Sequence, residues 1–252
     1  MKRCFLLFIA VTMILILDTT IFAASTGIHT ISSDTAFETG KIFEVRVGLS
    51  GNPGIISHRL NVQYDMTVLE LINVEDTGLL NNYTAPNSEI SSPYTLRWVD
   101  PLAVSNNTSN GDIAILTFRA IKATTYSAVG IIHLESRNWD GEKIDFTNSS
   151  AIIEVTSPLI VSVVRNNLIE IRNVSDRAIS CKGLYLTNDD DLLKWQMPCV
   201  IIRQGEAVRV KTENNNVDVV LKRLQTNFNL SVGETISLTD ARGNVWALCV
   251  VN

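Results

Sequence analysis

Several signatures of enzymes and metalloproteins are missing from these 252 residues. There are three histidines, in separate segments, and no serine or cysteine stands in a GxSxG nucleophile elbow. Phosphate-binding loops, HExxH helices and EF-hand loops are absent too. No CxxC pair occurs among the four cysteines, which argues against zinc. We therefore expect a non-catalytic protein that needs no metal or cofactor.

Clustered positive charge is also missing. The net charge is −5, and basic residues gather nowhere beyond Lys222 and Arg223. Because nucleic-acid-binding proteins usually carry a basic patch, nucleic acid is not an expected partner. The acidic run 189–191 could suggest calcium. Adjacent carboxylates without further ligands hold calcium poorly, so a solvated hairpin tip explains the run better.

A long apolar run occurs once, at the N-terminus. Two basic residues precede a run from Phe5 to Leu17, and the small residues Ala23 and Ala24 follow. This pattern predicts a secretory signal peptide over residues 1–24 and a secreted or cell-surface location. The alternative is an uncleaved membrane anchor, since about 20 apolar residues cross a bilayer.

Cysteine is scarce beyond that segment, where Cys181, Cys199 and Cys249 remain. Three is an odd number, so at most one internal disulfide forms. The simplest expectation is that these residues are small and buried.

Helical periodicity is absent, because no stretch shows a 3.6-residue apolar stripe over three turns. Short β-type runs are separated instead by turn residues, as at Asp140-Gly141. This pattern predicts an all-β protein built from β-sandwiches. The expected strands are 28–32, 42–49, 55–64, 69–74, 95–99, 113–121, 130–134, 151–155, 168–173, 183–187, 199–202, 207–212, 234–238 and 245–251.

Ser157-Pro158 is the expected boundary between two domains. Proline cannot donate to a β ladder, and it restricts the residue before it to extended geometry. We therefore expect domains at residues 25–156 and 157–252.

The first domain is organised around residues 54–78. An alternating strand leads into Tyr64-Asp65, and a short turn is followed by Leu69-Glu70-Leu71. This YDxxxLEL corner resembles the signature of the cohesin domain. Residues 110–119 are similar to the family's later G-x-hydrophobic-A-x-L-T-F strand. The resemblance implies a nine-stranded jelly roll that binds a dockerin-type protein in an extracellular polysaccharide-degrading or surface assembly.

The second domain resembles the lamin-tail domain, an immunoglobulin-like sandwich. The motifs that carry this resemblance occur in order and cover most of the segment; they are residues 169–175, 183–188, 202–208, 228–240 and 242–246. Trp246 stands where that family usually has an acid.

The cohesin resemblance implies that a dockerin binds one sheet face, made by strands corresponding to 55–64, 95–99, 113–119 and 130–135. Alternation predicts which side chains point outward on these strands. The candidate partner-binding residues are Ser57, Arg59, Asn61, Arg97, Val99, Ile113, Ile115 and Thr117.

Two features of this set bear on the partner. Ile113 and Ile115 make their strand apolar on both sides, which indicates either a partner patch or cover by a loop or the second domain. Well-known cohesins have Asn and Asp where this chain has Ser57 and Arg59. The expected partner surface is therefore acidic or polar, facing Arg59 and Arg97. His58 has inward parity and is expected to be a core or edge histidine and not a catalytic base.

Two other functions remain open. Related sandwiches bind polysaccharide through a row of exposed aromatic rings, for which Tyr83, Tyr94, Trp98 and Trp139 are the candidates. Alternatively, both sandwiches serve as structural spacers in an envelope assembly.

Overall fold

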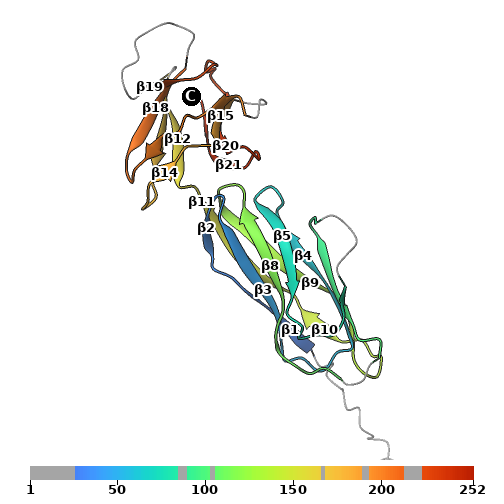
Figure 1. Cartoon of the computed structure of the whole chain (residues 1–252). Coiled ribbons are helices and arrows are strands. Elements are labelled where there is room, and N and C mark those ends of the chain that lie inside the picture. The colour runs from blue at the N-terminus through green and yellow to red at the C-terminus, as the bar shows by residue number, and fades with distance from the viewer. Residues whose placement is uncertain (1–25, 85–89, 103–105, 166–167, 189–192, 213–222) are drawn as a thin grey trace, which may run out of the picture.

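The structure, a computed structural model, describes residues 26–84, 90–102, 106–165, 168–188, 193–212 and 223–252. Every secondary-structure element assigned among these residues is a β-strand. The strands form two lobes (Figure 1). The predicted all-β class is confirmed. The predicted signal peptide and the acidic run 189–191 lie outside the described residues. Within the described part of the chain, no helix is long and apolar enough to cross a membrane.

The first lobe is a sandwich of two sheets. A five-stranded sheet has the order β10-β1-β3-β8-β5 and a six-stranded sheet the order β2-β11-β9-β4-β7-β6. The strands are β1 (Thr26–Ser32), β2 (Ala36–Glu38), β3 (Ile42–Ser50), β4 (Ser57–Tyr64), β5 (Leu69–Asp76), β6 (Tyr83–Thr84), β7 (Tyr94–Val99), β8 (Gly111–Ala120), β9 (Thr124–Arg137), β10 (Asp145–Thr147) and β11 (Ser149–Thr156).

The core of this lobe follows from the alternation within its strands. Along β4, every second side chain from His58 to Tyr64 is buried, and the side chains between them face outward or are half-buried. The corner after β4 is held locally, because Asp65 Oδ1 accepts hydrogen bonds from Thr67 N at 2.8 Å and Thr67 Oγ1 at 2.7 Å. This turn directs the chain into β5 in the opposite sheet.

The second lobe is also a sandwich. Its sheets have the orders β12-β13-β18-β19 and β16-β15-β20-β21, with a small β14-β17 pair. The strands are β12 (Leu159–Arg165), β13 (Leu168–Asn173), β14 (Ile179–Ser180), β15 (Leu184–Asn188), β16 (Trp195–Gln196), β17 (Ile201–Ile202), β18 (Ala207–Lys211), β19 (Arg223–Gln225), β20 (Thr235–Asp240) and β21 (Val245–Val250).

Two hydrophobic cores lie on either side of Ser157-Pro158, one between Phe37 and Val155 and the other between Leu159 and Val251. The lobes touch next to this junction: Arg177 donates to the Glu38 carboxylate, and Lys122 forms a β-bridge with Val245. That the two halves are separate domains stays a prediction.

Three cysteines are free thiols in the structure. The expectation of burial is met by Cys181 and is wrong for Cys199, which is exposed, because the chain around Cys199 runs on the surface between β16 and β17.

Candidate binding face

Five of the predicted site residues lie together on the outer side of the six-stranded sheet. Ser57, Arg59 and Asn61 alternate along β4 with the buried side chains. Arg97 and Val99 lie next to them on β7, in register with Arg59 and Ser57. On the other side of β4, β9 places Glu135 beside Arg59 and Arg137 beside Ser57. We call the outward side chains of these three strands the β9–β4–β7 face.

The other three predicted residues do not belong to this face. Ile113, Ile115 and Thr117 lie on β8, which pairs with β3 and β5 in the five-stranded sheet. The expectation that all eight residues share one surface is therefore wrong. Ile113 is fully buried, because a register shift in the β3–β8 pairing turns both Ile113 and Ala114 into the core. Ile115 and Thr117 are half-buried.

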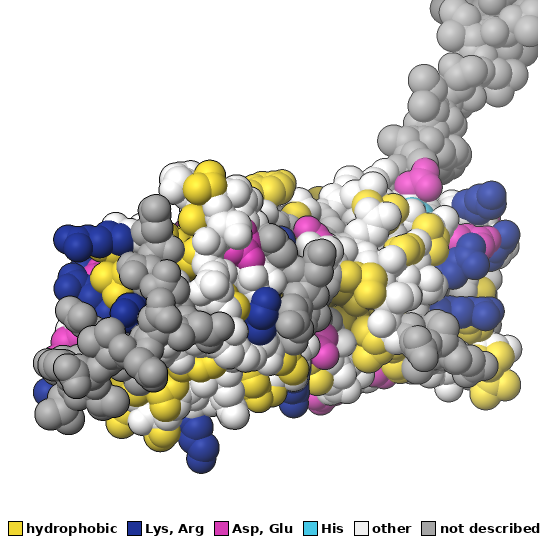
Figure 2. All heavy atoms as spheres, turned by 90° about the horizontal axis from the view of Figure 1, so that it is seen from above, with side chains coloured by type: hydrophobic (Ala, Val, Ile, Leu, Met, Phe, Trp, Pro, Cys, Tyr) yellow, Lys and Arg dark blue, Asp and Glu magenta, His cyan; other side chains and the backbone are white. Residues whose placement is uncertain are grey.

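The centre of the β9–β4–β7 face carries an excess of positive charge. Glu135 is shared by two arginines, with Arg137 Nη2 at 3.0 Å and Arg59 Nη2 at 3.6 Å from its carboxylate oxygens. Arg97 is exposed, and within the described ranges it has no ion-pair partner. These side chains surround a hollow of about 320 Å³ that also includes Ser57. On the right of Figure 2, basic side chains gather around acidic ones at one end of the molecule.

An apolar side chain borders this charged centre, because Leu134, next to Glu135 on β9, is 41% exposed. Ile152 on β11 is 56% exposed, but it lies opposite Ala128, seven residues along β9 from Glu135. Leu134 stands out because the β4–β9 register shifts between Arg59 and Leu60 and leaves it without an opposite residue. Sequence reasoning missed Leu134, Glu135 and Arg137. The alternation of Glu135 and Arg137 was visible in the sequence, but the pairing that sets them beside β4 was not.

The comparisons with known proteins identify the first lobe. The profile of the cohesin domain family matches residues 29–144. This part of the chain is a cohesin domain. No curated protein matches the chain.

Several solved cohesin structures are similar to it. The cohesin of a type I cohesin–dockerin complex from Clostridium thermocellum is 18% identical, with 53% of this chain and 97% of that chain covered and a TM-score of 0.42. The seventh ScaB type I cohesin of Pseudobacteroides cellulosolvens is 22% identical, with 52% and 95% covered and a TM-score of 0.41. A non-cellulosomal cohesin of the archaeon Archaeoglobus fulgidus is 18% identical, with 52% and 92% covered and a TM-score of 0.43.

The aromatic side chains of the cohesin domain do not form an exposed row. Trp98 and Tyr94 are buried and Tyr83 is half-buried, whereas Trp139 is 44% exposed. Tyr126 is 65% exposed, but it lies near the opposite end of β9 from Trp139. At about 3.3 Å per residue the two rings are separated by roughly 35–40 Å of strand. A glycan chain would not stack on both within one short binding site.

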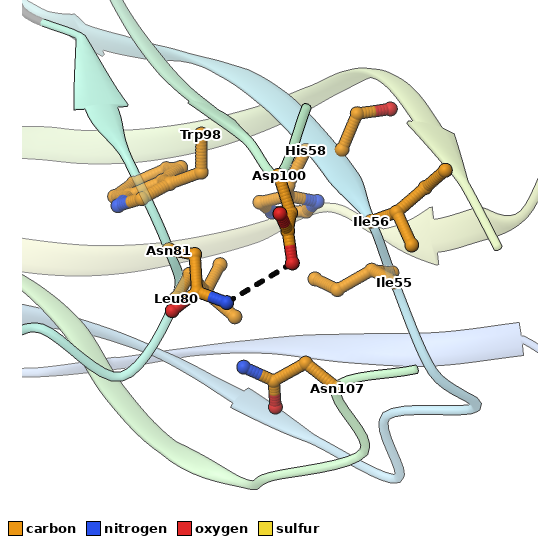
Figure 3. A pocket seen from close by; sticks show the side chains of 9 residues that line it. Ile55, Ile56, His58, Leu80, Asn81, Trp98, Asp100 and Asn107 are labelled. Carbon is orange, nitrogen blue, oxygen red and sulfur yellow. Dashed lines mark hydrogen bonds between the residues drawn. The ribbon is translucent and has the colours of Figure 1, made fainter. Parts of the chain in front are cut away.

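A small pocket opens at the end of the cohesin domain beside this face. Its walls include His58, Trp98 and Asp100, and Asn81 Nδ2 donates to Asp100 Oδ2 at 3.2 Å (Figure 3). The pocket measures about 10 Å³, which is about the space that one water molecule needs. It is therefore too small for an organic substrate.

All three histidines meet inside the cohesin domain, which sequence reasoning did not anticipate. Their ring centroids are 5.1 to 6.1 Å apart. His58, expected at a core or edge position, lies in the core, since it is 1% exposed. Over the part of the chain that the structure describes, no group of three His, Cys, Asp or Glu side chains is arranged to hold a metal ion.

Proposed function

We propose that the cohesin domain binds a dockerin-type protein partner through the β9–β4–β7 face, and that the chain acts as a non-catalytic adaptor. The observation that supports this most is the positive centre of the face. Arg59, Arg97 and Arg137 face a single carboxylate, Glu135, on a chain whose net charge is −5. Local charge opposite to that of the whole protein favours a specific acidic partner over general adsorption.

The chemistry of the face predicts the chemistry of the partner. Arginine recognises carboxylates through paired N–H donors, and such charge-assisted bonds are the stronger ones. Arg97 has these donors available, while Asn61 already accepts a hydrogen bond from Thr95 Oγ1 at 2.7 Å. An Asp or Glu of the partner would fit between Arg97 and Arg59, with Leu134 receiving an apolar contact.

The remaining parts of the proposal concern the setting. A secreted or surface location would place the adaptor in an extracellular polysaccharide-degrading or envelope assembly. The second sandwich would serve as a lamin-tail-like accessory module. Its resemblance to that family and the predicted signal peptide support this setting. Calcium, if required, would belong to the dockerin.

The experiment is a capture assay with the purified chain as bait and the secreted proteins of its source organism as prey. We expect proteins with dockerin modules to be retained with calcium and released by a chelator. Arg97→Glu should weaken binding to a captured dockerin by at least about tenfold, or about 1.4 kcal/mol, because it places a like charge before the acidic partner. Arg59→Asp should act in the same direction.

The matched control is Arg46→Glu, a charge reversal of the same kind on β3 of the opposite sheet, where Arg46 is also about half-exposed. Equal losses from Arg46→Glu and Arg97→Glu would rule out the β9–β4–β7 face. Retention on insoluble polysaccharide without protein capture would favour a carbohydrate-binding module. If the chain binds neither, a structural spacer becomes the better explanation.

A further inference from the structure

The three histidines and Ser136 form one continuous hydrogen-bonded chain across the cohesin domain. His29 Nε2 and His58 Nε2 are 3.1 Å apart, His58 Nδ1 is 2.7 Å from Ser136 Oγ, and Ser136 Oγ is 2.9 Å from His133 Nε2. We call these four residues the histidine chain. His29 lies on β1 of the five-stranded sheet, and the others lie on β4 and β9 of the six-stranded sheet. The histidine chain therefore ties the two sheets together.

The His29 end of the histidine chain determines which ring nitrogens carry a hydrogen. His29 Nδ1 lies 2.8 Å from the carbonyl oxygen of Thr147, and because a carbonyl only accepts, this nitrogen carries the hydrogen. Because a neutral ring carries one hydrogen, His29 Nε2 is unprotonated and accepts a hydrogen bond from His58 Nε2–H. His58 Nδ1 is therefore also unprotonated, and it accepts a hydrogen bond from the Ser136 hydroxyl.

The other end agrees with this assignment. Ser136 Oγ, having donated to His58, accepts from His133 Nε2–H. His133 Nδ1 is then bare and faces the backbone N–H of Phe146, 3.5 Å away. With three neutral rings, every hydrogen of the histidine chain has one acceptor and every acceptor has one hydrogen.

An added proton disrupts this arrangement. If His29 becomes doubly protonated, its Nε2–H meets the N–H of His58 unless His58 shifts its hydrogen to Nδ1. Ser136 then receives N–H groups from both neighbouring rings, and its own hydrogen loses His58 as acceptor. The charge would also be buried, since His29 and His58 are each 1% exposed, and burying a charge is costly.

The pKa directions agree with the geometry. Burial lowers the pKa of His29 to about 4, against the raising effect of its hydrogen bond to Thr147. Burial lowers the pKa of His58 well below its usual value, and the neighbouring histidines lower it further. Burial also lowers the pKa of His133, although Asp145 acts in the opposite direction.

Few charged groups lie where they could oppose the lowering of the histidine pKa values. On β10, Asp145 acts on His133, and Asp100 shares the small pocket with His58. Arg59, Glu135 and Arg137 lie on the outer side of β4 and β9, where they surround the hollow of the β9–β4–β7 face. β1 contains no other titratable residue. The rings are otherwise packed against Phe146, whose ring lies 5.0 to 5.7 Å from all three.

Solvent comes closest to the histidine chain at two places. His133 is only half-buried. His58, although its side chain is buried, belongs to the walls of the pocket of about 10 Å³ in Figure 3 and of the hollow of about 320 Å³ on the β9–β4–β7 face. A metal site is a poorer explanation of the cluster, because only His29 Nε2 and His58 Nε2 converge while both nitrogens of His133 are directed elsewhere.

We propose that the histidine chain is an acid-sensitive latch of the cohesin domain: neutral, it holds β1 and β10 onto β4 and β9, and when protonated it releases them. The latch lies directly behind the β9–β4–β7 face, since His58 separates Ser57 from Arg59 and Ser136 separates Glu135 from Arg137. Acid would therefore also disorder the partner-binding face. This consequence rests on the function proposed above, whereas the latch does not.

The sign of the pH effect follows from the lowered pKa values. Unfolded histidines take up protons near pH 6.5, while folded His29 resists protonation down to about pH 4. The stability contributed by the latch is therefore complete above about pH 6.5 and is lost as the pH falls toward 4.

The test is the pH dependence of unfolding of the full chain, measured without any partner. If unfolding takes up about two histidine protons between pH 6 and 5, the unfolding constant of the first sandwich rises roughly 100-fold per pH unit. His29→Gln keeps a hydrogen-bond donor for the Thr147 carbonyl. It should reduce the rise of the unfolding constant to roughly 10-fold per pH unit. The second sandwich contains no histidine and is the internal control. An unchanged slope in His29→Gln would overturn the proposal.

A second measurement needs no variant and reads the protons directly. Long-range nitrogen–proton NMR of the histidine rings at pH 7 should show the hydrogen on Nδ1 of His29 and on Nε2 of His58 and His133. Ser136→Ala should raise the pKa of His58, because it removes the hydroxyl that donates to the unprotonated Nδ1 of that ring. A charged His29 or His58 ring at pH 7, or a different set of tautomers, would also overturn the proposal.

Discussion

The two sandwiches of this chain differ in which titratable side chains they contain. The first holds all three histidines, and beyond the N-terminal segment it has no cysteine; the second holds three cysteines and no histidine. Both are built from alternating strands around an aliphatic core. The shared architecture therefore does not determine how each half responds to pH, and the difference comes from a few buried polar residues.

In the second sandwich, two exposed arginines hold the largely buried carboxylate of Glu170. Glu170 accepts hydrogen bonds from Arg172 Nη2 at 2.7 Å and Arg209 Nε at 3.0 Å. The bond from Arg172, followed by that from Arg209, lowers the pKa of Glu170 below 4.5. This contact stabilises the fold above that pH and is lost only as the pH falls further. The second sandwich should therefore withstand mild acid that opens the first.

The largest test of the comparison is whether the two cores unfold separately. Phe118→Ala removes a fully buried ring from the first core and should cost about 3–5 kcal/mol of unfolding free energy. Leu238→Ala should cost about 2–5 kcal/mol in the second core. Scanning calorimetry of each variant should show one transition lowered and the other unmoved. If both transitions shift together, the halves form one cooperative unit.

The cysteines of the second sandwich provide a test of that half, because their thiols differ in burial. Burial raises the pKa of Cys181 to about 11, with Cys199 adding to the effect. Relative to a thiol at 9.0, about 100-fold less thiolate is present at neutral pH, and thiolate is the reactive form. Exposed Cys199 should therefore be labelled first, and Cys181 only when the second sandwich opens. Time-resolved alkylation read by mass spectrometry would measure this, and equal rates for both would contradict the buried position of Cys181.

Each half fixes a loop with one buried asparagine, so the comparison predicts similar costs there. Asn52 Nδ2 donates to the carbonyls of Asn107 at 3.0 Å and Ser109 at 2.9 Å, and Asn173 Nδ2 donates to that of Ile202 at 2.8 Å. Replacing either by alanine should cost about 1–3 kcal/mol, because carbonyls lose their donor. Urea unfolding would measure both.

The control for these two variants is Asn227→Ala, which removes an exposed donor to Lys194 O at 3.2 Å. It should change the unfolding free energy by less than about 0.5 kcal/mol. A similar cost at all three asparagines would mean that the buried bonds have no special role.

What the sequence could predict follows the range of the interactions involved. The outward positions of Ser57 and Arg59 were predictable because alternation is a property of the strand itself. The corner at Asp65 was predictable for the same reason, since its bonds reach only two residues along the chain.

Long-range pairing was not predictable. The sheet to which β8 belongs depends on its partners β3 and β5, and Ile113 is buried through a register shift that leaves no local mark. The histidine chain joins residues 29 and 133 across two sheets, and no local pattern brings them together. β12 was missed because it begins beside Pro158, which also suits the start of a strand.

The smallest expected effect concerns the contact between the halves. Arg177 and Glu38 form an ion pair whose side chains are 57% and 33% exposed, and pairs of this kind contribute about 0–1 kcal/mol. A double-mutant cycle of Arg177→Ala and Glu38→Ala should give a coupling energy in that range that decreases with salt. Arg172→Ala, within the second sandwich, is the control and should leave the first transition unmoved. A coupling well above about 1 kcal/mol would mean that the junction is cooperative, and protonation of the histidine chain would then destabilise the second sandwich as well.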